Sequence, residues 1–234
     1  MQQLNAKSFP TNSVWSSFRN FTKSKGNSSA AVKTMFVSIL ILLLNMLTGV
    51  LTARYLGPTG RGEQTAMVNW SQFLAFSMSF GIPSALIYNA KKNPDDAGVL
   101  YRMALIIALF FGTAAMIVGI VVLPYWLKSF SPEVVQFAQW SMILCPLIVV
   151  SQVNNATFQF RGDYKRFNWL RYLIPLMTLM MIGVLILTGT MTAFTTAVAY
   201  LAPSVPLFIW MTINLLRTYK VKMRDSYQQF KKLF

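Results

Sequence analysis

The chain has 234 residues, of which 55% are hydrophobic and only 12% are charged, whereas an ordinary soluble domain carries about 25% charged residues. Its net charge of +15 comes from side chains that lie between apolar runs, so orientation in a membrane explains the charge better than binding to nucleic acid does. The absence of His and the single Cys145 exclude an internal disulfide, a Cys/His zinc site and a Ser-His or Cys-His catalytic pair. We therefore expect no catalytic residue, no metal, no cofactor and no enzyme activity.

Six segments are long and apolar enough for spanning helices, which need about 20 residues. In chain order they are Ala31–Leu56, Gln64–Asn89, Gly98–Leu127, Val134–Phe158, Phe167–Gly189 and Ala193–Leu216. Buried helices of a soluble protein are the alternative, but none of the six segments is amphipathic. The sequence predicts an all-α, polytopic membrane protein with a polar tail over 1–30, a six-helix lobe over 31–217 and a basic tail over 218–234.

The Lys and Arg residues divide unequally between the two sides that six spans create. Eighteen of the 21 fall on the side of both termini, and three fall on the other side, namely Arg54, Arg61 and Lys128. Cytoplasmic loops carry the excess of Lys and Arg in membrane proteins. We therefore expect both termini to be cytoplasmic.

The third segment repeats small residues on one helical face. They are Ala108, Gly112, Ala115 and Gly119. Small residues let two helix backbones approach closely in a membrane. This pattern predicts a packing seam.

Polar side chains form stripes along the first, second and fourth segments. Amides in hydrocarbon are costly unless they find partners or water. They either form interhelical hydrogen bonds, worth about 0.6 kcal/mol each, or line a water-filled cavity. The candidates for binding a sugar in such a cavity are Asn45, Asn69, Gln72, Gln152, Asn155 and Gln159.

Acidic residues are confined to predicted loops and helix ends. They are Glu63, Asp95, Asp96, Glu133, Asp163 and Asp225. A proton or sodium relay built on an intramembrane carboxylate is therefore not visible in this sequence.

Prolines gather in the last three segments. They are Pro146, Pro175, Pro203 and Pro206. Each removes a backbone donor, so we expect kinks at these positions.

Two stretches of sequence resemble a known family. The first is LTGVLTARYLGPTGRG over residues 47–62, and the second is QFRGDYKRFNWLR over residues 159–171, followed by Pro175. They resemble the end of the first helix and the loop between helices four and five in polysaccharide flippases of the O-antigen and teichuronic-acid type. These flippases belong to the superfamily that includes the multidrug and toxin extruders. The matching motif residues are Ala53, Arg54, Gly57, Pro58, Gly60 and Gly62.

The resemblance covers about residues 32–234 and implies one lobe, the N-terminal half, of a transporter with two similar lobes. It implies a bacterial cytoplasmic membrane protein that moves undecaprenyl-linked oligosaccharide from the inner to the outer leaflet, with the lipid in the bilayer and the sugar in a central cavity. The expected partners are the lipid bilayer, this substrate and a second lobe or chain. Arg161 and Arg171 are candidates for meeting the pyrophosphate, although the positive-inside rule alone also accounts for them.

Three other functions stay open. A drug or cation exporter of the same superfamily would want an intramembrane carboxylate, which is absent here. A membrane acyl- or glycosyltransferase is disfavoured by the lack of His and of acidic pairs. A non-transporting remnant or assembly partner is the third, because the resemblance supplies one lobe.

Overall fold

The computed structural model describes residues 27–219, and every regular element in this range is a helix. Five helical stretches are long and apolar enough to cross a membrane, and they are Val32–Ser77, Pro94–Trp126, Pro132–Phe160, Tyr164–Leu187 and Ala193–Thr218. The protein is therefore a polytopic all-α membrane protein, as predicted. The predicted tails fall mostly outside the described residues, since they cover 1–30 and 218–234.

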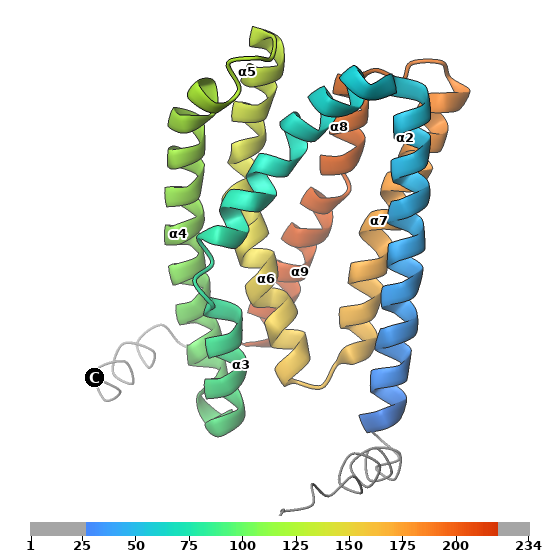
Figure 1. Cartoon of the computed structure of the whole chain (residues 1–234). Coiled ribbons are helices and arrows are strands. Elements are labelled where there is room, and N and C mark those ends of the chain that lie inside the picture. Colours follow the sequence, from blue (N-terminus) through green and yellow to red (C-terminus); the bar gives the residue numbers. More distant parts are fainter. Residues whose placement is uncertain (1–26, 220–234) are drawn as a thin grey trace, which may run out of the picture.

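The helices stand side by side in one bundle, and successive connections alternate between its two ends (Figure 1). In chain order the elements are α2 (Asn27–Ser77), α3 (Ile82–Lys92), η1 (Pro94–Asp96), α4 (Ala97–Trp126), α5 (Pro132–Ser141), η2 (Met142–Leu144), α6 (Cys145–Phe160), α7 (Tyr164–Leu187), α8 (Ala193–Leu201) and α9 (Ser204–Thr218).

We call the end of the bundle that holds the start of α2 and the α6–α7 connection the basic end. Nine of the twelve Lys and Arg residues between 27 and 219 lie in connections at this end or in the half of a helix that is nearer to it. The other three are Arg54, Arg61 and Lys128. The structure thus separates the charges as the alternating spans require, while the cytoplasmic orientation of the basic end stays a prediction.

Two arms make up α2, and they join at Gly57. This residue has φ 67° and ψ −179° inside the element, a conformation that glycine adopts without the steric cost of a Cβ. Pro58 begins the second arm, where its missing N–H would have had no helical partner. The first arm, 27–56, runs beside α7, and the second, 58–77, crosses the bundle toward α4 and α6 (Figure 1).

The prediction of one continuous second span over Gln64–Asn89 is wrong. The second arm ends at Ser77, Phe80 and Gly81 have φ values of 42° and 73°, and α3 begins at Ile82. Pro83 lies in the first turn of α3, where a missing N–H is tolerated, whereas in a continuous helix it would remove a hydrogen bond. The second arm and α3 together complete the crossing (Figure 1).

Two later spans are interrupted at prolines, as predicted. A 3-10 turn, η2, separates α5 from α6 immediately before Pro146, and Pro203 lies between α8 and α9. Pro175 instead lies within the continuous helix α7, and Pro206 lies in the first turn of α9. The kinks expected at these two positions therefore produce no break in the helix.

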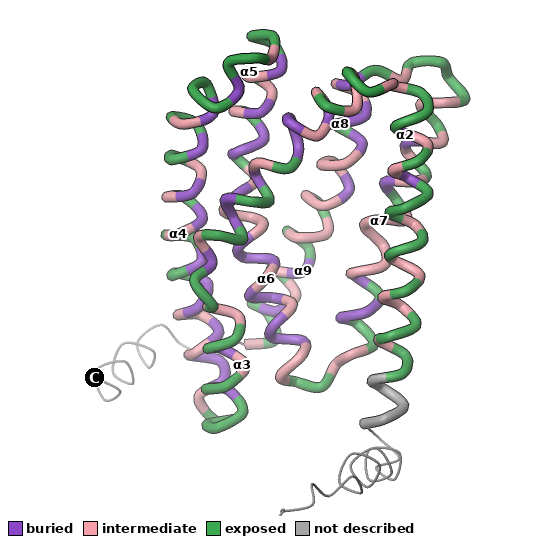
Figure 2. The backbone as a smooth tube through the Cα atoms, in the orientation of Figure 1, coloured by how far each residue is buried: buried purple, intermediate pink, exposed green. Residues whose placement is uncertain are grey.

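The small-residue face of α4 packs against α6. Figure 2 shows buried residues along α4. All four members of the small-residue face are buried, namely Ala108, Gly112, Ala115 and Gly119. A Cβ added to Gly112 would lie 2.5 Å from the Cα of Pro146, and one added to Gly119 would collide with the Met142 side chain. The predicted packing seam is confirmed, because a larger side chain at Gly112 would meet the backbone of α6.

A buried hydrogen-bond chain joins α4, α6 and α9. The Tyr101 hydroxyl donates to Asn154 Oδ1 at 2.8 Å, and Asn154 Nδ2 donates to Thr212 Oγ1 at 2.8 Å. Asn154 is fully buried and has partners for both ends of its amide. Its side-chain amide therefore connects packed helices. Interhelical hydrogen bonding is one of the two roles that the sequence left open for polar side chains, the other being the lining of a water-filled cavity.

Candidate functional site

A polar cavity of about 440 Å³ lies between the second arm of α2, α3, α6, α7, α8 and α9. Its polar lining side chains are Gln72, Ser151, Gln152, Asn155, Gln159, Arg171, Tyr200 and Ser204. The rest of the wall is apolar, with side chains such as Phe76, Ile148 and Phe208. We refer to this space as the polar cavity.

The polar cavity brings together four of the six amides that the sequence singled out. Gln152, Asn155 and Gln159 lie at positions i, i+3 and i+7 of α6, so they share one helical face. Gln72 faces the same space from the second arm of α2. Because α6 buries its other face against α4 and α9, the amide face is left for the cavity.

The amide of Gln152 is incompletely satisfied. Its Nε2 is buried and makes no hydrogen bond to any residue that the structure describes. Leaving a buried donor unpaired costs about 1–3 kcal/mol. Gln152 lines the polar cavity, so a side-chain rotation that turns Nε2 into this space would relieve the cost by bringing it to water or a hydrogen-bonding ligand.

Arg171 supplies the positive charge of the polar cavity. It also lines an adjoining space of about 250 Å³, which reaches the first arm of α2 at Ile41. Its guanidinium carbon lies 5.1 Å from the centroid of the Phe167 ring. No Asp or Glu lines either space within the described chain, so the charge of Arg171 has no carboxylate to balance it there.

Arg61 reaches the polar cavity through Tyr200, a contact that the sequence analysis missed. Its Nη1 donates to the Gln64 side-chain oxygen and to the Tyr200 hydroxyl at 3.4 Å, and its guanidinium carbon lies 5.8 Å from the Tyr200 ring. Gln64 is only 2% exposed. The sequence signal that could have identified the Arg61–Gln64 pair is a basic residue three positions before an amide at the start of a span.

Two predicted cavity amides, Asn45 and Asn69, do not line the polar cavity and are exposed. The first arm of α2 instead turns Thr48 and Thr52 toward the bundle, which leaves Asn45 off the buried face. Asn69 likewise lies away from the buried face of the second arm, although Gln72, one turn further, lines the cavity. A binding role for the two Asn residues stays a prediction.

Of the two arginines predicted to meet a pyrophosphate, the structure brings only Arg171 to the cavity. Arg161 is exposed at the end of α6, with its guanidinium carbon 5.5 Å from the ring of Tyr219. Burial raises the pKa of the Tyr219 hydroxyl, although the Arg161 charge lowers it in part. Arg102 joins this group by donating from Nη2 to the Tyr219 carbonyl oxygen at 3.0 Å.

The six motif residues surround the bend of α2, and none of them lines the polar cavity. They are Ala53, Arg54, Gly57, Pro58, Gly60 and Gly62. Only Arg61, which lies between two of these glycines, extends toward α8. Gly57 and Pro58 shape this bend, while a functional role for the motif residues stays a prediction.

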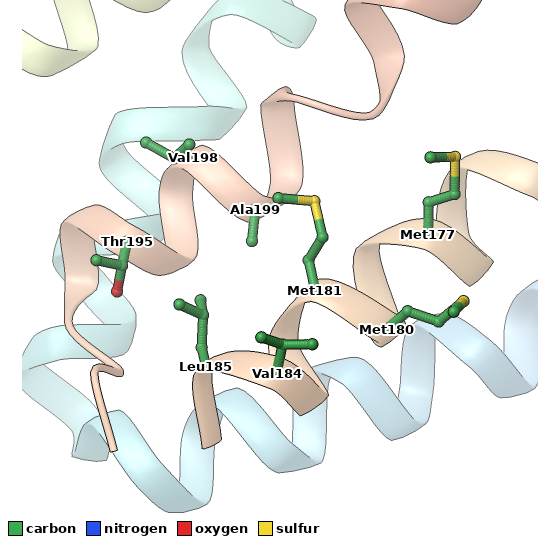
Figure 3. A pocket seen from close by; sticks show the side chains of 8 residues that line it. All are labelled: Met177, Met180, Met181, Val184, Leu185, Thr195, Val198 and Ala199. Carbon is green, nitrogen blue, oxygen red and sulfur yellow. The ribbon is translucent and has the colours of Figure 1, made fainter. Parts of the chain in front are cut away.

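A second space of about 510 Å³ lies between α7 and α8 and is almost entirely apolar. Figure 3 shows the side chains that surround it, and they are Met177, Met180, Met181, Val184, Leu185, Thr195, Val198 and Ala199. We refer to this space as the methionine pocket. No charged residue lines it.

Comparison with known proteins identifies solved structures with a similar fold but no matching family. No protein-family model matches the chain, and no curated protein matches it. Solved structures do match. One is a MOP superfamily transporter from Pyrococcus furiosus, described as having a binding pocket of reverse polarity that suggests a different function, at 19% identity and TM-score 0.65. Another is an outward-facing multidrug resistance MATE family transporter of the same superfamily, at 20% identity and TM-score 0.65.

Each match covers 82% of this chain and 46% of the other chain, so this chain spans less than half the length of the solved transporters. Sequence identities of 19% and 20% accompany a shared fold but do not indicate a shared substrate. The chain therefore has the fold of a MOP superfamily transporter over the part of those transporters that it matches.

Proposed function

We propose that the chain is part of an exporter that moves a lipid-linked oligosaccharide across the bacterial cytoplasmic membrane. The observation that carries this proposal is the lining of the polar cavity, which combines four amides with one unbalanced arginine and no carboxylate. In this proposal the oligosaccharide occupies the polar cavity while its lipid stays in the bilayer.

The amides suit a neutral sugar. Each amide both donates and accepts hydrogen bonds, which matches sugar hydroxyls that also do both. Gln152 and Asn155 project from one face of α6, and Gln72 faces them from α2. The unpaired Nε2 of Gln152 supports a ligand with an acceptor oxygen at this place, because a buried polar group normally has a partner.

The charge of the cavity favours an anion over a cation. Arg171 can form charge-assisted hydrogen bonds to a phosphate, and its planar guanidinium suits this geometry. A cationic drug in the same place would face the arginine without a carboxylate to offset it. The Pyrococcus furiosus transporter, for which pocket polarity suggested a different function, supports judging the substrate class from cavity polarity instead of from the fold.

The length of the matched transporters supports a second component. This chain covers 46% of them, so we propose that a second lobe or chain completes the pathway. The excess of Lys and Arg at the basic end supports a cytoplasmic location for that end.

The test is a binding measurement, because every residue that lines the polar cavity belongs to this chain. The full chain in lipid nanodiscs would be titrated with a fluorescent undecaprenyl diphosphate oligosaccharide and, separately, with the lipophilic cation ethidium. We expect saturable binding of the oligosaccharide lipid and weaker binding of ethidium. Equal or tighter binding of ethidium would instead favour the drug exporter, for which the likeness to a multidrug transporter is the supporting observation.

A matched pair of variants assigns the binding to the cavity. Gln152→Leu removes a lining amide, whereas Asn89→Leu removes an exposed amide on α3 outside the polar cavity. We expect the first variant to weaken oligosaccharide-lipid binding and the second to leave it unchanged. Equal affinities for both variants would contradict the assignment of the cavity.

A further inference from the structure

A third space, of about 900 Å³, opens at the basic end between the start of α2 and the start of α7. Its α2 wall is apolar and includes Phe36, Val37 and Leu40, and its α7 wall includes Asn168 and Trp169. The α6–α7 connection closes one side. We call this space the α2–α7 groove. It is separate from the polar cavity, and its lining shares no residue with it.

The rim of the α2–α7 groove is positively charged. Lys33 and Lys165 line it, and both are exposed. The one acidic residue in the lining, Asp163, already pairs with Arg166 at 3.4 Å. The two lysines therefore remain available to a negatively charged group from outside.

Asn168 adds an unmet hydrogen bond inside the groove. The residue is 8% exposed, and its Nδ2 donates to Thr34 Oγ1 at 2.9 Å. Its Oδ1 is buried and accepts no hydrogen bond within the part of the chain that the structure describes. Buried acceptors in proteins normally have a donor. Because Asn168 lines the groove, a rotation of its side chain would let this oxygen accept a hydrogen bond from a ligand that also carries negative charge.

The remaining lining residues are of the types that occur where lipid meets water. Trp169, Tyr164 and Tyr172 line the groove beside the lysines, and aromatic residues of this type gather at membrane interfaces. The apolar α2 wall runs from the lysine rim toward the middle of the span. A molecule that fits would have a charged head at the rim and a hydrocarbon tail along Phe36 and Leu40.

We propose that the α2–α7 groove binds an anionic phospholipid whose headgroup carries free hydroxyls, as phosphatidylglycerol does. The phosphate lies between Lys33 and Lys165, a headgroup hydroxyl donates to Asn168 Oδ1, and the acyl chains follow the apolar wall of α2. Basic sites between helices at a membrane surface recognise lipid headgroups through this combination of charge and burial. The inference does not depend on the substrate proposed for the polar cavity.

Native mass spectrometry of the full chain tests this site. Retention would be compared for phosphatidylglycerol, phosphatidic acid and phosphatidylcholine, in wild type and in two double variants. Lys33→Gln with Lys165→Gln removes the rim charge, while Lys91→Gln with Lys92→Gln removes the same charge from exposed α3 residues outside the groove. At about fivefold per lysine near a membrane surface, we expect phosphatidylglycerol affinity to fall roughly twentyfold in the first variant and less than about twofold in the second.

Asn168→Leu separates the headgroup contact from the charge. We expect it to weaken phosphatidylglycerol binding while leaving phosphatidic acid, which lacks the glycerol headgroup and its alcohol hydroxyls, unchanged. Equal losses in the two lysine variants, no preference of the wild type for phosphatidylglycerol over the other two lipids, or equal effects of Asn168→Leu on both anionic lipids would each overturn the proposal. Coverage of the groove by residues 1–26 would appear as lipid binding that is insensitive to Lys33 and Lys165, which also overturns it.

Discussion

The polar cavity and the methionine pocket have similar volumes, about 440 and 510 Å³, and both use α7 and α8 as walls. They differ in the helices that complete them. The polar cavity receives its amides from α6 and from the second arm of α2, whereas the methionine pocket is lined by α7 and α8 alone. The shared helices therefore line both spaces, whereas α2 and α6 supply the amides of the polar cavity and Arg171 on α7 supplies its charge.

This difference explains why the two spaces should bind different groups. In water, a hydrogen bond to a ligand replaces one to water, so the net gain in free energy is small. A buried polar group without any hydrogen-bond partner, in contrast, costs several kcal/mol. The polar cavity can meet that requirement with Gln72, Gln152 and Asn155. The methionine pocket offers flexible, polarizable thioethers that adapt to apolar shapes, so its lining suits an apolar group.

The largest expected effect comes from Arg171→Gln, which removes the unbalanced charge of the polar cavity. Hydrogen bonds to charged groups contribute about 1.5–3 kcal/mol, so affinity for a diphosphate-linked oligosaccharide lipid should fall roughly 10- to 100-fold. Titration in nanodiscs measures this change. Arg217→Gln, at the end of α9 and outside the cavity, is the control, and an equal loss there would mean that bulk charge is responsible.

The next effect is on the stability of the helix pair that holds the amide face in place. Gly112→Ala would bring a Cβ to 2.5 Å from the Pro146 Cα, which is backbone and cannot rotate away. Overpacking of this kind costs about 1–3 kcal/mol. A matched Gly183→Ala on α7 meets nothing within 4 Å and replaces a glycine inside a helix, so it should be neutral or stabilising.

Thermal unfolding of the purified variants measures these two changes. We expect a lower unfolding temperature for Gly112→Ala than for wild type, and no decrease for Gly183→Ala. If Gly112→Ala unfolds at the wild-type temperature, α4 and α6 are not held together by close backbone approach at this position.

The sequence was sufficient for the parts of the fold that depend on composition and helical spacing. Apolar length predicts the spans, and the interval between Gly112 and Gly119 predicts the seam that the structure contains. The break between the second arm of α2 and α3 was not predicted. Hydropathy runs through Phe80 and Gly81 without interruption, although the positive φ values of these two residues and the nearby Pro83 separate the two helices.

The candidate site was partly predictable for a similar reason. Amides are rare in spans, so the face formed by Gln152, Asn155 and Gln159 could be identified from spacing alone. Asn69 and Gln72 have the same chemistry and lie one turn apart, and only packing places the second of them in the cavity. Met181 and its neighbours could not be distinguished from lipid-facing residues, because both groups are simply apolar.

A smaller effect is expected from Gln72→Leu, which removes one amide from the polar cavity. A neutral hydrogen bond contributes about 0.5–1.5 kcal/mol, so oligosaccharide-lipid affinity should fall roughly two- to tenfold. Asn69→Leu alters the same helix one turn earlier, where the side chain is exposed and off the cavity, so an affinity at the wild-type value would overturn the binding role predicted for Asn69. The reverse order of the two affinities would show that the exposed face of α2 recognises the sugar.

The smallest effect is expected in the methionine pocket. Met181→Gln places an amide among apolar side chains at a volume close to that of the polar cavity. If space plus one amide were sufficient to bind sugar, this variant would increase oligosaccharide-lipid affinity. We expect a change of less than about twofold, because one added amide cannot supply the several convergent polar groups that orient a ligand in a binding site. The same titration measures it, with membrane protein levels as the check on folding. A fivefold change in either direction would mean that the two spaces act as one site, since α7 and α8 form walls of both.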